Sequence, residues 1–513
     1  MVQASREIAI VEIGSTGMRL IIASIDEQQQ WKILDRAGKS LAMGKDVFTT
    51  GQITWESLLE CISALQNFRE LMKSWEIADA NIHIIATSAL RAARNRDIFM
   101  DRVFQETGFL VKIVDGIEEN RLMYLGVRYA LRQDLPEFRE GNSMIVEAGG
   151  GSTEIILLNQ GKIVAAHSLN IGTIMIDRIG RRPLGSIRSS ERYLTETIRK
   201  TSGFLKEEME LANAKTFVII GTDAWILATR IGRELNDQCR IISREDFLAF
   251  AETIRSYTIE DCVKKLQIPH SDAPRFIIGN LVYKLFLERT AASQVAIPNI
   301  SIREGYLVDL TMGVDPELQE EFYSQIIASA VNLGRKYRFD EAHNCHVSEL
   351  CLMLFDFLAG KHGMTRRERM LLEVAAILHD VGEFIENSEH HKHSQYIVNN
   401  SEIFGISAEE QGIIANAVRY HRGDAPSSSD FAFAVLQREE RIVVLKIIAL
   451  LRVADALDRS HSQHITGDIR LDQRGDSIFF HTSGNLDLSS EQRALDEKAD
   501  MFRDVFGYKV HLT

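Results

Sequence analysis

Residues 8–25 read IAIVEIGSTGMRLIIASI, and residues 144–169 repeat the pattern as MIVEAGGGSTEIILLNQGKIVAAHSL. In each stretch an apolar, β-rich run ends in a turn of small residues and a second apolar run follows, which is typical of a β-hairpin. When the two stretches are aligned, Glu12 falls on Glu147 and Gly14 falls on Gly149. Such self-similarity predicts two copies of one α/β unit that face each other across a cleft.

The two turns have the composition of an anion-binding site. Glycines and small hydroxylic residues let backbone N–H groups converge on an anion, and a Ser or Thr side chain adds a donor. A carboxylate before each turn is placed to hold a divalent cation opposite a phosphate. A plain hairpin with a glycine-rich turn explains either copy alone, but the matched pair favours phosphate binding.

The segment IIATSALRAARNR, residues 84–96, predicts a strand, a short turn and a helix that begins near Ala89. Thr87 and Ser88 are positioned to cap this helix, and Arg91 falls in its first turn. An arginine is disfavoured at the positive end of a helix dipole unless an anion is bound there. A solvated surface arginine is the alternative.

The segment DGIEENRLMYLGV, residues 115–127, places Glu118 and Glu119 at a predicted helix start. Acidic residues at this position are ordinary partners of the helix dipole, so the pattern by itself does not require a catalytic role.

Composition limits the classes of protein that remain. The 513 residues suggest about three or four domains, and the formal charge of −13 argues against a nucleic-acid coat protein. The best apolar run, residues 442–451, is too short for a membrane span and contains Lys446. The N-terminus has no signal-peptide pattern and the five cysteines form no CxxC pair, so we expect reduced thiols in a cytoplasmic protein.

The chain resembles the exopolyphosphatase / guanosine pentaphosphate phosphohydrolase family in five ordered segments: VEIGSTGMRL, ATSALRAARN, GIEENRLMYLGV, VEAGGGSTEIIL and SIREGYLVDL. The resemblance covers essentially the whole chain. It implies an α/β actin-like (ASKHA), duplicated ribonuclease-H-type fold. It also implies Mg²⁺-dependent (or Mn²⁺-dependent) hydrolysis of terminal phosphoanhydride bonds in inorganic polyphosphate or guanosine pentaphosphate.

The resemblance also assigns site residues. It makes Glu119 the catalytic base that activates the attacking water, and Glu154 a carboxylate that binds the metal or positions the water. Glu12 and Glu147 are the other metal candidates. It assigns phosphate binding to a further set: Ser15, Thr16, Arg91, Gly149, Gly150, Gly151, Ser152 and Thr153. Positioning, charge neutralisation and an oriented nucleophile are the main contributions a protein makes to phosphoryl transfer.

Several positions depart from the family pattern. Glu12 and Glu147 stand where the family usually has Asp, and Ala42 stands where an Arg is common. Asp223 and Trp225 lie in IIGTDAWILA, a segment that usually reads GGTA. The bulky Trp225 makes this segment a poor purine site, which argues against the rival interpretation of a nucleotide-dependent kinase. The paired Asp-to-Glu change favours a retuned active site, and the alternative is a non-catalytic polyphosphate or alarmone sensor.

Past Gly313 the apolar periodicity becomes helical, as in ERMLLEVAAILHD and VVLKIIALLRVADALDR. This part resembles an HD-type domain, whose metal positions match His346, His379, Asp380 and Asp455. In this interpretation His346 opens a helix, while His343 is left at the surface. Imidazole and carboxylate ligands suit a second divalent metal. A metal-stabilised structural domain is favoured over a second phosphohydrolase centre.

We therefore predict four domains: actin-like lobe I at 1–130, lobe II at 131–312, an HD-type helical domain at 316–465 and a small α+β domain at 466–513. A homodimer is expected, with no nucleic-acid or membrane partner. Polyphosphate is slightly favoured as substrate, because the helical half offers a second surface for a long chain.

Overall fold

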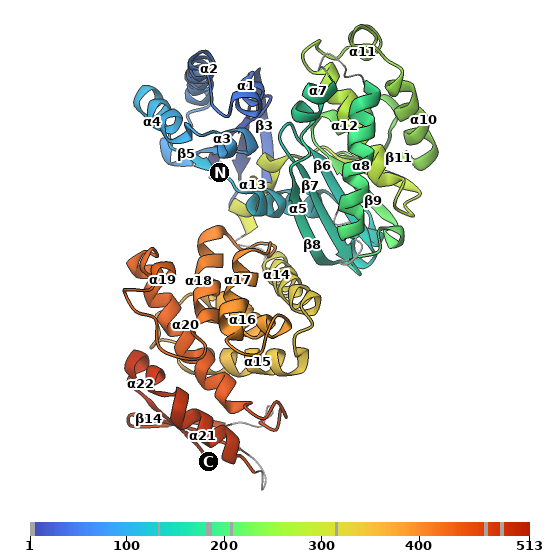
Figure 1. Cartoon of the computed structure of the whole chain (residues 1–513). Coiled ribbons are helices and arrows are strands. Elements are labelled where there is room, and N and C mark those ends of the chain that lie inside the picture. Colours follow the sequence, from blue (N-terminus) through green and yellow to red (C-terminus); the bar gives the residue numbers. More distant parts are fainter. Residues whose placement is uncertain are drawn as a thin grey trace. The chain divides into compact units, whose positions relative to one another are not determined.

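The computed structural model describes residues 6–131, 134–180, 187–205, 209–312, 316–465, 470–482 and 487–513. The chain divides into two compact units, Met1–Phe322 and Tyr323–Thr513 (Figure 1). Within the described ranges, no helix has both the length and the apolarity needed to cross a membrane.

The first unit contains a five-stranded sheet in the order β3-β2-β1-β4-β5. Its strands are β1 (Arg6–Gly14), β2 (Gly17–Ile25), β3 (Trp31–Ser40), β4 (Ile82–Ala86) and β5 (Val111–Ile113). Strand β1 is antiparallel to β2 and parallel to β4. The helices that accompany this sheet are α1 (Met43–Thr50), α2 (Trp55–Ser74), α3 (Ser88–Ala92), α4 (Arg96–Thr107) and α5 (Gly116–Leu131).

A seven-stranded sheet in the order β10-β11-β12-β9-β6-β7-β8 follows in the same unit. Its strands are β6 (Ser143–Ala148), β7 (Thr153–Asn159), β8 (Lys162–Leu169), β9 (Thr216–Ile220), β10 (Arg233–Asn236), β11 (Cys239–Ser243) and β12 (Gln294–Pro298). Its helices are α6 (Pro136–Glu140), α7 (Thr173–Gly180), α8 (Ile187–Leu205), α9 (Thr222–Ile231), α10 (Arg244–Arg255), α11 (Ile259–Leu266) and α12 (Ala273–Leu287).

The internal duplication is visible in the strand order of the two sheets. Strand β6 is antiparallel to β7 and parallel to β9, just as β1 is antiparallel to β2 and parallel to β4. Both predicted hairpins are thus confirmed. Glu12 and Glu147 each lie near the carboxyl end of the first strand of their hairpin. The two glutamates therefore occupy equivalent positions just before the two turns.

Buried aliphatic side chains hold each sheet in place. In β7 every residue from Thr153 to Leu158 is buried, which is typical of a strand covered on both faces. Helix α13 (Ile302–Met312) follows the second sheet in sequence, yet Ile302 and Leu307 share an apolar cluster with Ile8 and Ile10 of β1. The chain therefore returns to the first sheet, where α13 packs beside α5.

The second unit is mainly helical, as the periodicity predicts (Figure 1). Its helices are the end of α14 (Pro316–Lys336), then α15 (Glu341–Phe357), α16 (Arg366–Leu378), α17 (His390–Asn399), α18 (Ala408–Arg419), α19 (Phe431–Ala434) and α20 (Arg438–Leu457). Side chains of Thr365 and Ser407 cap α16 and α18 in capping boxes with Glu368 and Glu410, which satisfies N–H groups that helix starts leave free.

The C-terminal residues add a small sheet in the order β13-β14-β15. Its strands are β13 (Arg470–Arg474), β14 (Ser477–His481) and β15 (Lys509–Leu512), and its helices are α21 (Ser489–Lys498) and α22 (Asp500–Phe506). Both helices pack against α20.

Candidate active site

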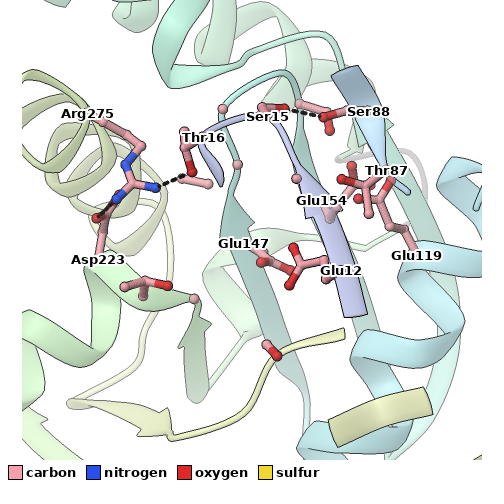
Figure 2. A pocket seen from close by; sticks show the side chains of 18 of the residues that line it. Glu12, Ser15, Thr16, Thr87, Ser88, Glu119, Glu147, Glu154, Asp223 and Arg275 are labelled. Atoms are coloured by element: carbon pink, nitrogen blue, oxygen red, sulfur yellow. Dashed lines mark hydrogen bonds and ion pairs between the residues drawn. The ribbon is translucent and has the colours of Figure 1, made fainter. Parts of the chain in front are cut away.

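The two hairpin turns line one cavity of about 90 Å³ in the first unit. The first hairpin contributes Glu12, Gly14, Ser15, Thr16 and Arg19, and the second contributes Glu147, Ala148, Gly149, Gly150, Ser152 and Glu154. Figure 2 shows Glu12 and Glu147 pointing toward each other from their two strands. The structure thus brings the aligned glutamates together, as the duplication predicts.

Glycine allows the two turns to approach closely. A Cβ added at Gly150 would lie 2.9 Å from the Cβ of Ser15, which is closer than such atoms pack. The backbone N–H of Gly44 donates to the Ser15 carbonyl at 2.8 Å, and this bond fixes the first turn against the start of α1. A side chain at position 150 would push the turns apart.

The helix after β4 begins at Ser88, but its start differs from the predicted cap. Thr87 occupies the N-cap position, yet its side chain makes no capping hydrogen bond. The Ser88 hydroxyl instead lies 2.9 Å from the Ser15 hydroxyl. The predicted hydroxyl cap was therefore wrong, because the nearby turn of the first hairpin offers Ser88 a partner.

Three of the residues assigned to phosphate binding lie outside the lining of this cavity. The Thr153 hydroxyl is buried and donates to the Ile171 carbonyl at 2.6 Å. Gly151 lies under Phe48, whose ring an added Cβ would meet at 2.3 Å. Arg91 contacts Glu119. Five of the eight residues assigned to phosphate binding, Ser15, Thr16, Gly149, Gly150 and Ser152, therefore line the cavity, and these three do not.

Glu119 is held in the first turn of α5 by Arg91. One guanidinium nitrogen of Arg91 lies 2.6 Å from Glu119 Oε2 and donates to the Val114 carbonyl at 2.7 Å. Burial raises the pKa of Glu119 above its ordinary value, and Arg91 offsets only part of that rise. A carboxylate with a raised pKa that stays oriented by a cation has the properties of a general base.

Two further carboxylates in the cavity also have raised pKa values. Burial, with the nearby charges of Glu119 and Glu12, raises the pKa of Glu147 to about 8. Burial and Glu119 raise the pKa of Glu154 well above its ordinary value, although the Ser168 hydroxyl donates to it at 2.8 Å. Carboxylates that raise one another's pKa fit a divalent cation, which would relieve their repulsion. All these donors are oxygens, which suit hard divalent cations such as Mg²⁺, Mn²⁺ and Ca²⁺.

Three charged residues of the site were not assigned from the sequence. Arg275 donates to the Thr16 hydroxyl at 3.0 Å and lies 3.0 Å from the buried carboxylate of Asp223, and both contacts are drawn in Figure 2. Arg303 lies 3.1 Å from Glu12 Oε2. The departure at Asp223 thus has a structural reason, since it neutralises an arginine beside the first turn. Arg303 lies in SIREGYLVDL, one of the five segments that resemble the family, so the sequence did offer a signal that this arginine belongs to the site.

A second, larger cavity of about 610 Å³ adjoins the first. The two share Ser15, Thr16 and Arg275. The larger cavity has an apolar wall that includes Leu41, Ala42, Phe48, Ile174 and Pro274. Ala42 stands where the family commonly has an arginine, and its methyl group leaves this cavity open.

In the helical unit, His379 and Asp380 end α16 as predicted, with His379 Nε2 3.3 Å from Asp380 Oδ2. Asp455 lies on α20 and contacts Lys498 of α21. His346 is buried on α15, where its Nδ1 lies 3.8 Å from Glu349. The histidine that groups with His379 and Asp380 is His343.

The surface position predicted for His343 was wrong, because its side chain is fully buried. The helix begins at Glu341 rather than at His346, since the Asp340 side chain accepts from the His343 N–H at 3.1 Å and caps the helix. This earlier start turns His343 toward α16 and α20. The Asp340 cap was the sequence signal that would have placed it.

The fold and the site together define an α/β protein with duplicated hairpins whose turns line one acidic cavity. The chain belongs to the Ppx/GppA phosphatase family, whose model matches residues 21–312. A second model, Ppx/GppA phosphatase, domain III, matches residues 327–502.

Similar proteins agree with this assignment. A guanosine-5'-triphosphate,3'-diphosphate pyrophosphatase of Pseudoalteromonas atlantica is 25% identical over 461 residues, covering 87% of this chain and 85% of that protein. One of Vibrio parahaemolyticus is 21% identical, covering 92% and 90%. The crystal structure of an exopolyphosphatase from Cytophaga hutchinsonii matches with a TM-score of 0.53 at 20% identity, covering 60% of this chain and 99% of that one. This last likeness shows the fold.

Proposed function

We propose that the first unit hydrolyses the terminal phosphoanhydride bond of guanosine pentaphosphate and of inorganic polyphosphate. The observation that carries the proposal is the buried Glu119 carboxylate, held 2.6 Å from Arg91 at a cavity lined by both hairpin turns. The names of the relatives supply the substrate class.

In the proposed reaction, Glu119 accepts a proton from water as the water oxygen bonds to the terminal phosphorus. The bond from that phosphorus to the bridging oxygen breaks, and the shortened chain leaves with the electron pair. Arg91 is a positioning residue, since it contacts Glu119 and the Val114 carbonyl. The Ser15 and Ser152 hydroxyls, with backbone N–H groups of the two turns, would bind the phosphate. General-base catalysis of this kind contributes about 10²–10⁴ in rate.

The carboxylates Glu12, Glu147 and Glu154 would hold Mg²⁺, which when bound neutralises phosphate charge. Arg303 already contacts one oxygen of Glu12. A glutamate, which is one methylene longer than an aspartate, could reach both Arg303 and the Mg²⁺. We infer that the Glu-for-Asp changes retune the site and leave it active.

The larger cavity bears on the choice of substrate. It continues from the first turn through Ser15, Thr16 and Arg275, and its apolar wall includes Phe48. A polyphosphate chain has no apolar part to place there, whereas a nucleoside does. This cavity therefore favours guanosine pentaphosphate as the substrate, in place of the slight preference for polyphosphate drawn from the sequence.

Phosphate release from both substrates, with Mg²⁺ or Mn²⁺, tests the proposal. We expect Ala42→Arg, which places a long side chain in the larger cavity, to raise KM for guanosine pentaphosphate and to leave KM for polyphosphate much less changed. Glu56→Gln, on helix α2 outside the lining of both cavities, is the control. Folded wild-type protein that releases no phosphate from either substrate would overturn the hydrolase proposal in favour of the sensor.

We also propose that the helical part, 316–465, is an HD-type domain and that 466–513 form a small α+β domain. The His379–Asp380 pair at a helix end, with Asp455 on a neighbouring helix, supports the first statement. The sheet β13-β14-β15 with α21 and α22 supports the second. The limits of lobes I and II, at 1–130 and 131–312, and the homodimer stay predictions.

A further inference from the structure

Three side chains from separate segments of the first unit meet where its two cavities adjoin. Arg275, at the start of α12, donates to the Thr16 hydroxyl at 3.0 Å and lies 3.0 Å from a carboxylate oxygen of Asp223, in the first turn of α9. Both contacts are drawn in Figure 2. Thr16 and Arg275 line both cavities, whereas Asp223 lines only the smaller one. We call these three residues the arginine bridge.

Both charged members of the arginine bridge are buried. The side chains of Arg275 and Asp223 are 12% and 5% exposed. Water screens a buried pair of charges only weakly, so the two groups attract each other strongly. A carboxylate of the chain itself therefore neutralises Arg275 at the point where the phosphates of a ligand need a cation.

The ion pair leaves hydrogen-bonding capacity unused on both sides. Among the described residues, Nε of Arg275 and Oδ1 of Asp223 have no hydrogen-bond partner of ordinary geometry. A guanidinium is a planar fork of N–H donors that fits a phosphate with two parallel hydrogen bonds. Burial raises the pKa of Asp223 above its ordinary value although Arg275 opposes the rise. The pair is thus one that a phosphate group has the geometry to displace.

The proposed function brings a phosphate chain to this place. The smaller cavity, of about 90 Å³, takes the terminal phosphate between the two hairpin turns, and the larger cavity takes the nucleoside. The inner phosphates then cross the junction, where Arg275 is the cation that lines both cavities. Each phosphate that takes a hydrogen bond from Arg275 does so in competition with Asp223 and Thr16.

We infer that Asp223 sets the affinity of the active site for phosphate chains by competing with them for Arg275. The inference rests on the proposed function, since it requires a phosphate chain at the junction. In this role Asp223 is a positioning residue, because it acts through Arg275 and does not touch the reacting atoms. Its ligand class is a chain of two or more phosphates, which is long enough to extend from the smaller cavity to Arg275.

This competition has a consequence for turnover. Binding energy that substrate and transition state share lowers KM without raising kcat. A cation that held the inner phosphates tightly would also hold the shortened chain after cleavage, and product release limits the rate of many enzymes. Asp223 weakens that hold and leaves the contacts of the hairpin turns to the terminal phosphate unchanged.

Calorimetric binding of imidodiphosphate, a two-phosphate ligand whose P–N–P bridge resists hydrolysis, tests the inference in the full chain with Mg²⁺ present. We expect Asp223→Ala to tighten binding about tenfold, the effect of freeing one hydrogen bond to a charged group. Asp223→Asn, which keeps an acceptor but not the charge, should tighten it less. In steady-state phosphate release, Asp223→Ala should lower KM and give a kcat no higher than that of the wild type.

Asp309→Ala is the matched control. It also removes one carboxylate that is paired with an arginine, here Arg121, and Asp309 lies outside the lining of both cavities. Circular dichroism checks that each variant is folded, and Asp223→Asn decides the matter if Asp223→Ala does not fold. Unchanged or weaker binding in the folded Asp223 variants, or equal tightening in Asp309→Ala, would overturn the inference. Binding of imidodiphosphate needs no turnover, so this result and the hydrolase assay fail separately.

Discussion

Replacement of Glu119 by glutamine removes the proposed general base with little change in shape. The glutamine oxygen still accepts from Arg91, so the ion pair at 2.6 Å becomes a hydrogen bond from a charged donor to a neutral acceptor. Loss of the acceptor's charge costs about 1 kcal/mol. Removing one of several mutually repelling carboxylates offsets part of this cost. The melting temperature should therefore fall by no more than about 2–4 °C.

The effect on catalysis should be much larger than the effect on stability. Loss of a general base lowers the rate about 10²–10⁴-fold, equivalent to roughly 2.7–5.5 kcal/mol in the activation barrier. The assay is phosphate release from guanosine pentaphosphate at saturating substrate, which reports kcat. Because burial raises the pKa of Glu119, the wild type at saturating Mg²⁺ should lose activity as pH falls through that raised value, and the variant should lose this acidic limb.

Glu118→Gln is the matched control on the same helix. Its carboxylate lies 2.6 Å from Arg121, which is also bound to Asp309, and it does not line the cavity. We expect its kcat to stay within a few-fold of the wild type. A loss of less than tenfold in folded Glu119→Gln, or an equal loss in Glu118→Gln, would refute the assignment of the base.

Four further outcomes follow from the same site. Arg275→Ala leaves the buried Asp223 carboxylate without its cation, so we expect a loss of about 3–5 kcal/mol in urea unfolding, part of which Asp223→Ala in the same chain should recover. Apparent Mg²⁺ affinity should rise with pH toward about 8, because a proton on Glu147 competes with the cation; a flat profile would contradict this, and Glu147→Gln should abolish the rise. The same raised pKa means that, without Mg²⁺, Glu147 contributes stability at low pH that is lost as pH rises through about 8, which thermal unfolding across this range measures. Gly151→Ala places a Cβ 2.3 Å from the Phe48 ring, so we expect about 1–3 kcal/mol of destabilisation, and unchanged stability would show that the turn relaxes freely.

Local pattern in the sequence determined the elements that carry the site. The apolar runs around GSTG and GGGST specify hairpins, because alternation and small-residue turns act within a few residues. They also place Glu12 and Glu147 at equivalent strand ends, and the acidic start of α5 places Glu119 in a first helical turn. The helix end at His379–Asp380 is of the same kind, since Gly382 lies two residues beyond Asp380.

Only the tertiary structure decided which distant side chains meet. Helices α12 and α9 bring Arg275 and Asp223 to the turn that contains Thr16, where the three residues pair. The spacing of these residues in the sequence does not predict that they meet. The rotation of α15 decides whether His343 or His346 lies beside His379 and Asp380. The Asp340 cap and the packing of the neighbouring helices set that rotation. Local hydrogen bonding fixes an element's type within a short segment, whereas partners across the fold depend on packing of surfaces far apart in the chain.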